Sequence, residues 1–121
     1  MQWKLDKDRP ICPQLTEIVC VAIANGILET GQKLMSVREI ALQAGVNPNT
    51  VQKALENLER LGIIYSVRGS GSFVSDDKSV AKNTLERIIS ERTAEYFAQM
   101  KALGLDSNEI KKIVEEWNEN E

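Results

Sequence analysis

The sequence predicts a mainly α-helical fold with one small β-hairpin, organised as a winged helix-turn-helix domain and a short two-helix tail. Three observations predict it. Residues 36–61 have the pattern of two short amphipathic helices joined by a tight turn, and residues 63–74 have that of a β-hairpin. Residues 80–117 then carry a second pair of helical patterns. We therefore expect a domain over residues 1–75 and a separate tail over residues 76–121.

The helix-turn-helix is marked by its capping residues. Ser36 and Glu39 have the spacing of a capping box, and Gly45 can end the first helix in the left-handed conformation. Asn47 can cap the second helix, with Pro48 at its first position, where no N–H is needed. The apolar stripes are Val37, Ile40, Ala41 and Ala44 in the first helix and Val51, Ala54, Leu55, Leu58 and Leu61 in the second. In such a motif the second helix commonly lies in the major groove of DNA.

One earlier helix and the hairpin complete the domain. Pro10 and Pro13 flank a helix start. The apolar stripe of that helix consists of Leu15, Ile18, Val19, Ala22 and Ile23. Residues 63–67 and 72–74 are rich in β-branched and aromatic side chains, with turn residues at 68–71 between them. A hairpin in this position is the wing of a winged helix, here with an expected four-residue loop.

The tail has two helical patterns but too few residues for a hydrophobic core of its own. Residues 76–79 have the composition of a linker, a long helix is expected over residues 80–103, and Gly104 ends it. Asp106 and Glu109 have the spacing of a second capping box. The residues that we assign to dimerisation are Leu85, Ile88, Ile89, Tyr96, Met100, Leu103, Ile110, Ile113, Val114 and Trp117. Such stripes pack either on the winged domain of the same chain or on a second chain, and we expect a second chain.

Composition narrows the function classes. The chain has no histidine, which removes the commonest general base and metal ligand and argues against an enzyme or a metal centre. Cys12 and Cys20 lie about 12 Å apart along a helix, too far for a disulfide. No apolar run is long enough to cross a membrane and no signal peptide is evident, so we expect a cytoplasmic protein without cofactors.

The net charge of −3 is unevenly distributed. Residues 1–75 contain 8 basic and 7 acidic side chains, whereas residues 76–121 contain 7 basic and 11 acidic ones. Exposed charges more than about 10 Å apart are largely screened at physiological salt. The acidic tail therefore permits DNA binding if the basic residues of the domain share a face.

The second helix of the helix-turn-helix has a polar face formed by Asn49, Gln52, Lys53 and Glu56. Asn and Gln can each pair with two atoms of adenine, and Lys can donate to a phosphate or to guanine. The same spacing also fits an ordinary solvated helix face. Because the helix-turn-helix and wing patterns surround it, we interpret this face as DNA-reading. Glu56 is expected to lie outside the contact or to accept from a cytosine amine.

The order of motifs over residues 10–75 can be compared with that of known protein families. The motifs are Pro10-Ile11 with Gln14-Leu15, Gly31-Gln32-Lys33-Leu34, Ser36-Val37-Arg38-Glu39-Ile40-Ala41, Thr50-Val51 with Ala54-Leu55, Gly62-Ile63-Ile64-Tyr65 and Gly69-Ser70-Gly71-Ser72-Phe73-Val74. This series resembles the N-terminal domain of the GntR family of bacterial transcription regulators. The segment around Met35, the turn at residues 47–50 and the short tail resemble its YtrA subfamily. The resemblance implies a homodimeric repressor that binds double-stranded DNA, and two-fold symmetry makes its operator an inverted repeat.

The resemblance also implies DNA contacts from three elements. Arg38 matches an arginine that contacts DNA in GntR proteins, and the wing tip is placed in the minor groove. The complete set expected to bind DNA is Arg38, Asn47, Asn49, Thr50, Gln52, Lys53, Arg68, Gly69, Ser70 and Gly71. Many relatives carry arginine at the positions of Pro48 and Gln52, so their guanine readout does not carry over. We expect phosphate contacts and an A·T-biased readout instead.

Two alternatives stay open. A winged helix can also serve as a protein scaffold or contact RNA, although a protein interface would favour exposed aromatic side chains, Met or Leu over Asn, Gln and Lys. An unknown small-molecule effector is also compatible with the sequence. The tail is too short to enclose a drug-sized pocket of about 300 Å³, so such an effector would have to bind between two chains.

Overall fold

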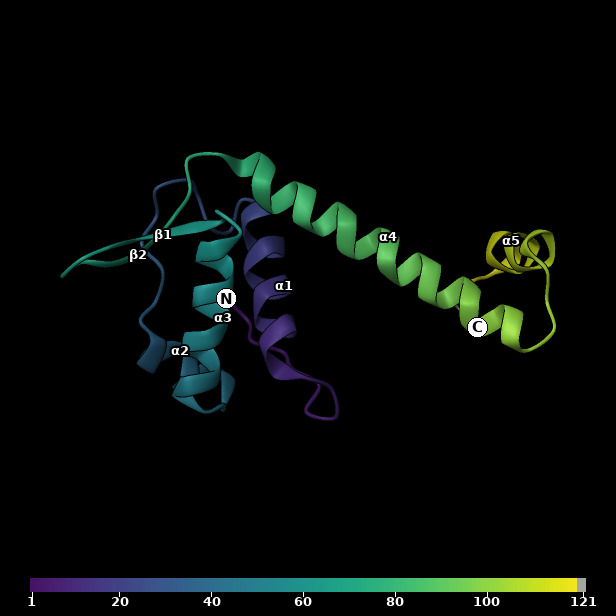
Figure 1. The fold of residues 1–121 in the computed structure, drawn as a ribbon, viewed down its shortest axis with the longest axis horizontal. Helices are drawn as coiled ribbons and strands as arrows, with labels where there is room; N and C mark the ends of the chain where they lie inside the picture. The colour runs from purple at the N-terminus through teal and green to yellow at the C-terminus, as the bar shows by residue number, and fades with distance from the viewer. Residues whose placement is uncertain (120–121) are drawn as a thin grey trace. The chain divides into compact units, whose positions relative to one another are not determined.

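The computed structural model describes residues 1–119 and confirms the mainly helical fold with a β-hairpin wing. It divides into two compact units, the first covering Met1–Leu85 and the second beginning at Glu86. The elements, drawn in Figure 1, are α1 (Ile11–Ala24), α2 (Val37–Ala44), α3 (Pro48–Arg60), β1 (Ile64–Val67), β2 (Gly71–Val74), α4 (Lys78–Ala102) and α5 (Ser107–Glu116).

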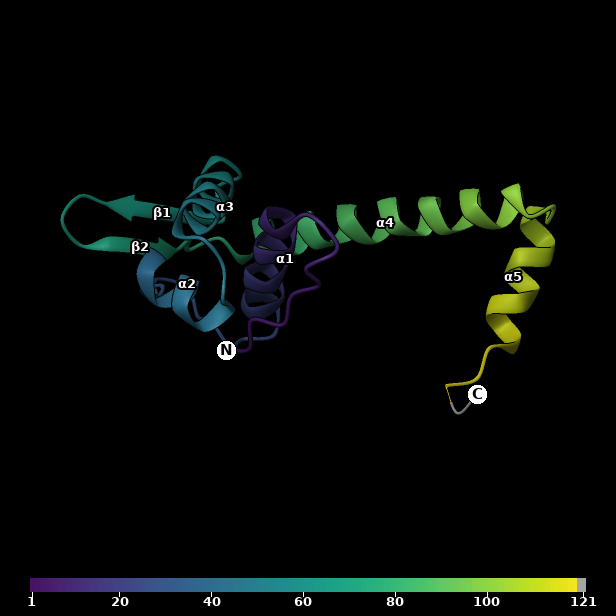
Figure 2. The same cartoon turned by 90° about the horizontal axis from the view of Figure 1, so that it is seen from below.

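The core of the first unit forms where α1 and α2 both pack against α3 (Figure 2). The largest side chains that are almost completely buried there are Val19, Ile23, Ile40, Val51, Leu58 and Ile63. Most of them belong to the apolar stripes expected from the sequence, so those stripes do face one another. Because α3 buries one side in this core, its opposite side is left to solvent.

The local signals of the helix-turn-helix are all present. The Glu39 backbone N–H donates to Ser36 Oγ at 3.1 Å, and the Ser36 N–H donates to Glu39 Oε1 at 3.2 Å, which completes the capping box. Gly45 ends α2 with φ of 69°, in the left-handed region that favours glycine. Asn47 caps α3 by accepting a bond of 2.8 Å from the Asn49 N–H. These caps fix the angle at which α3 leaves the turn.

The wing differs from the expectation by one residue. β1 and β2 pair antiparallel with Val67 opposite Gly71, so the loop contains only residues 68–70. Gly71 was expected in the loop, but it belongs to β2 because it continues the ladder. A third segment supports the hairpin, since Lys33 forms a β-bridge with Phe73.

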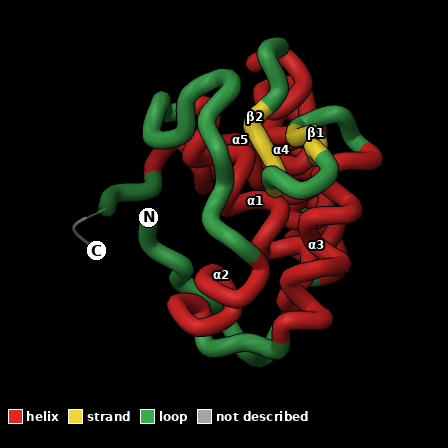
Figure 3. The backbone as a smooth tube through the Cα atoms, turned by 90° about the vertical axis from the view of Figure 1, so that its left-hand side faces the viewer, coloured by secondary structure: helices red, strands yellow, loops and turns green. Residues whose placement is uncertain are grey.

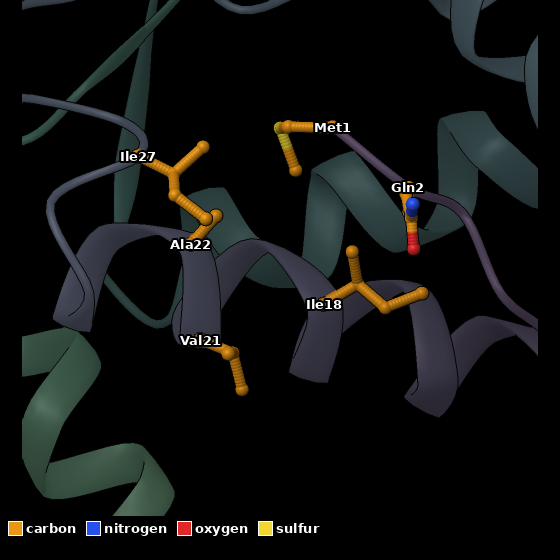
Figure 4. Close-up of a pocket in the computed structure, with 6 residues that line it drawn as sticks. All are labelled: Met1, Gln2, Ile18, Val21, Ala22 and Ile27. Carbon is orange, nitrogen blue, oxygen red and sulfur yellow. The ribbon is translucent and has the colours of Figure 1, made fainter.

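Residues 1–9 are attached to the first unit by specific hydrogen bonds. The buried Gln14 side chain accepts from the Asp6 backbone N–H and donates to the Asp6 carbonyl, both at 2.8 Å. The Trp3 indole N–H donates to Gln43 Oε1 on α2 at 3.2 Å. The segment is therefore part of the first unit, and its Met1 and Gln2 line a pocket together with Ile18, Val21, Ala22 and Ile27 (Figure 4).

The first unit extends into α4, beyond the boundary expected after Ser75. Asp77 starts this helix by accepting bonds from the Ser79 N–H at 2.9 Å and the Ser79 hydroxyl at 2.5 Å. These two bonds lower the pKa of the Asp77 carboxyl below its ordinary value of 3.8. Ala81 and Thr84 are buried, and Leu85 packs against the core of its own unit. Leu85 was expected to contact a second chain, whereas it is half-covered within its own protomer.

The second unit contains the rest of α4 and α5. Gly104 separates the helices with φ of 99°, and the Asp106–Glu109 capping box forms with bonds of 3.0 and 2.8 Å. Ile110 is completely buried in the protomer, so it cannot present an exposed surface to a partner as the sequence suggested. Of the residues that the sequence analysis assigns to dimerisation, Ile88 and Met100 are half-buried. Those that are exposed are Ile89, Tyr96, Leu103, Ile113, Val114 and Trp117.

Candidate nucleic-acid interface

The exposed side of α3 carries the polar face expected from the sequence. Its side chains are Asn49, Gln52, Lys53 and Glu56, all exposed. The Gln52 amide donates to Glu56 Oε1 at 3.4 Å along this face. The second N–H and the carbonyl oxygen of the Gln52 amide stay available, and Lys53 has no intrahelical partner among residues 1–119. The polar face of α3 is thus accessible along its first two turns.

The start of α2 and the turn contribute three further expected residues. Arg38 is exposed in the first turn of α2, and among residues 1–119 it pairs with no carboxylate. The carbonyl oxygen of the Asn47 side chain already accepts the capping bond, so its amide nitrogen is the group left to donate. Thr50 is half-buried in the first turn of α3. Arg38 is therefore the unpaired cation of this region.

The wing loop holds the remaining expected contacts. Arg68, Gly69 and Ser70 are all exposed at the tip. Behind them the rings of Tyr65 and Phe73 stack across the strands with centroids 5.7 Å apart. This cross-strand pair stiffens the hairpin and holds the loop out from the core.

Three cations of these elements form no ion pair within residues 1–119. Arg38, Lys53 and Arg68 come from α2, α3 and the wing, which Figure 3 shows together from one side of the first unit. The same two helices carry three carboxylates, of which Glu39 and Glu56 each accept a hydrogen bond and Glu59 is exposed. Because Arg38, Lys53 and Arg68 form no ion pair with a described carboxylate, they are available for an anionic partner such as the DNA backbone.

Lys33 also borders this side of the unit and was not among the residues expected to bind DNA. The structure places it beside the wing because it pairs with Phe73, which is far away in the sequence. No local pattern in the sequence indicates that the Lys33 side chain lies against the hairpin.

Gly71→Val is expected to weaken DNA binding more than it destabilises the fold. Gly71 has φ of 119°, which a β-branched residue rarely adopts, and a Cβ there would lie 3.1 Å from Lys33 Cε. The wing would shift while the helical core stays intact. Titrating DNA and measuring Tm on the same sample separates the two effects. Ser66→Val, an exposed position of β1 that can accept a β-branched side chain, should change neither, and a Gly71→Val protein with full affinity would contradict a required wing geometry.

Other kinds of site find little support in residues 1–119. No group of three or more His, Cys, Asp and Glu side chains among them is arranged to hold a metal ion. In the same part of the chain no helix combines the length and apolar character that a membrane crossing requires.

Comparison with known proteins shows to which class of proteins the chain belongs. Residues 14–74 match the model of the bacterial regulatory proteins of the gntR family. The chain is 38% identical over 112 residues to the HTH-type transcriptional repressor YtrA of Bacillus subtilis (strain 168), covering 89% of this chain and 81% of that one. Its fold resembles a GntR family transcriptional regulator from Listeria monocytogenes, with a TM-score of 0.80, 34% identity and coverage of 94% and 100%. It also resembles AraR(DBD) in complex with operator ORX1, with a TM-score of 0.54, 33% identity and coverage of 62% and 92%. The chain therefore belongs to the GntR family of bacterial transcription regulators, among its short YtrA-like members.

Proposed function

We propose that this GntR-type, DNA-binding transcription regulator represses transcription by binding an inverted-repeat operator as a homodimer. The observation that carries the proposal is the arrangement of α3. Its apolar side is buried in the core, while its polar face is exposed on the same unit that carries the exposed Arg38 and the wing loop. A solved relative with the same domain fold, AraR(DBD), is bound to an operator.

In this proposal the side-chain amides of Asn49 and Gln52, on the polar face of α3, recognise the bases. Asn49 and Gln52 each offer a donor and an acceptor, the pair that matches adenine in the major groove. Lys53, Arg38 and Arg68 supply positive charge for phosphates, which fix the register without reading sequence. An operator with adenine at the positions facing Asn49 and Gln52 follows from these assignments.

The homodimer is proposed from an uncovered row of apolar side chains on α4. Ile89 and Tyr96 lie in α4, and Leu103 lies in the turn directly after its last residue. These three residues recur every seven residues and are 62%, 39% and 78% exposed; we call them the apolar row of α4. A seven-residue repeat of this kind is how two helices pair with each other. Trp117, 66% exposed at the end of α5, adds a large apolar surface. A second copy carries the same row, so a two-fold axis covers both at once.

The proposed function has consequences for the binding place of an effector, for the cellular compartment and for the alternative of a protein scaffold. A small-molecule effector would bind between the two chains, because the tail is too short to enclose one. The protein would act in the cytoplasm, where a bacterial operator lies. A protein scaffold would favour exposed aromatic side chains or Met on the polar face of α3, and that face carries amides and charges instead.

Three alanine variants test the DNA-binding face. Gln52→Ala should cost about 1–3 kcal/mol on the operator and relax the base preference at one position. Lys53→Ala and Arg68→Ala should weaken operator and random DNA alike and lower the salt slope of binding by about 1 each. Titrations at several salt concentrations measure both effects. Lys101→Ala, an exposed lysine near the end of α4, is the control and should change nothing. Three variants that all bind like the wild type would show that another face is used.

A further inference from the structure

Lys33 is held in position by the wing itself. Its neighbours are tied to β2 by backbone bonds, since the Leu34 N–H donates to the Ser72 carbonyl at 2.8 Å and the Val74 N–H to the Gln32 carbonyl at 2.9 Å. Lys33 therefore behaves as a residue of a third, very short strand, directly opposite Phe73. In an antiparallel pair, residues opposite each other have side chains on the same face of the sheet. The Lys33 side chain accordingly shares a face with Phe73.

The stem of Lys33 then runs over Gly71. A Cβ at Gly71 would lie 3.1 Å from Lys33 Cε and 3.9 Å from Lys33 Nζ, so the missing side chain of the glycine makes room for the lysine. The ammonium group is thereby brought to the base of the wing loop. The position of the ammonium group is set by the backbone hydrogen bonds to β2 and by the space at Gly71.

The ammonium borders a groove of about 550 Å³ between the wing and the helix-turn-helix. Ser70 and Gly71 line its wing side, and Ser36, Glu39 and Leu55 line its helical side. Glu39 is the carboxylate in this lining, and it is bound to the Ser36 N–H in the capping box. Lys33 is the cation among the residues that line the groove.

DNA geometry indicates what this groove would contain. A helix in the major groove and a wing in the adjacent minor groove must straddle the sugar-phosphate strand that separates the two grooves. Resting on the proposed function, we propose that this groove receives that strand and that Lys33 neutralises one of its phosphates. Lys33 thus joins Arg38, Lys53 and Arg68 as a cation that binds the DNA backbone, placed between the two elements that enter the grooves.

The test is the salt dependence of binding by Lys33→Met and Lys33→Arg in the full chain. Methionine keeps an unbranched stem over Gly71 and removes the charge, whereas arginine keeps the charge. Lys33→Met should lower the salt slope by about 0.9, the value for one phosphate contact, on both operator and random duplexes. The ratio of the two affinities should stay unchanged, because phosphates carry no sequence information. Lys33→Arg should retain the wild-type slope, and so should the control Lys101→Met.

Two results would overturn the assignment of Lys33. If Lys33→Met keeps the wild-type slope while Lys53→Ala and Arg68→Ala lower it, the DNA face is right and Lys33 does not touch a phosphate. If Lys33→Met weakens binding without changing the slope, Lys33 only supports the wing. A failure of the proposed function would look different, since then none of the cation variants of this face would change the slope.

Discussion

Replacing Ile89 and Leu103 together by glutamate is expected to give a folded monomer that binds its operator about 10²–10⁴-fold more weakly than the wild type. Both residues are exposed in the apolar row of α4, so the substitution should not disturb the core of either unit. Two glutamates would place four like charges across a two-fold axis and separate the chains. Each winged domain would then bind its half-site alone, without the effective concentration that a tether supplies.

Sedimentation velocity and operator titration on the same samples measure this effect. The matched control is Ala94→Glu with Ala98→Glu, which adds the same charge at exposed positions of α4 on the side away from the row. The control should remain a dimer with nearly normal affinity. A wild-type chain that sediments as a monomer at about tens of micromolar, the range in which weak interfaces associate, would contradict the dimer.

A fragment that ends at Leu85 provides an independent check of the same idea. Cutting after Ser75, at the boundary expected from the sequence, would remove Ala81 and Thr84 from the core, whereas a cut after Leu85 keeps both. We expect the longer fragment to be folded and monomeric, with operator affinity close to that of the double glutamate variant. An undiminished affinity of this fragment would mean that residues after Leu85 do not join two chains.

Leu58→Ala is expected to lower the free energy of unfolding by about 2–5 kcal/mol. Leu58 is completely buried on the inner side of α3, the helix against which both α1 and α2 pack. Its loss leaves a cavity that the surrounding helices can fill only partly, so the cost exceeds that of transferring the side chain to water. Urea denaturation measures the effect. The neighbouring Glu59→Ala, at an exposed position, should stay within about 0.5 kcal/mol of the wild type.

A small effect of Leu58→Ala would contradict a core centred on α3. The consequence for function is also specific. DNA affinity measured well below Tm should be nearly unchanged, because Leu58 lies on the opposite side of α3 from Gln52 and Lys53. A large loss of affinity in a fully folded Leu58→Ala protein would mean that the core and the polar face are not separable.

The helix-turn-helix could be predicted because its signals are local. Ser36 and Glu39 are three residues apart and satisfy each other's backbone bonds whatever the rest of the chain does. Gly45 and Asn47 are also local signals, because Gly45 ends α2 and Asn47 caps the start of α3. The stripes of α1, α2 and α3 were equally readable, since each needs only the spacing of a helix.

Features that depend on distant contacts could not be predicted in this way. Leu85 and Ile110 have the spacing of an exposed stripe, yet each is covered within its own protomer by residues that periodicity alone does not identify. The strand status of Gly71 depends on its pairing with Val67. The position of Lys33 beside the wing depends on its bridge to Phe73, and side-chain patterns do not specify such a bridge.

Footprinting of the full-length protein on the genomic DNA that it enriches tests the central claim most directly. We predict two protected half-sites related by inverted symmetry, with centres about 10 base pairs apart or a multiple of that spacing, and two chains bound per site. Gln52→Ala should relax one base position symmetrically in both halves. A single half-site occupied by one chain, or protection without any enriched sequence, would contradict a homodimer that reads its operator through α3.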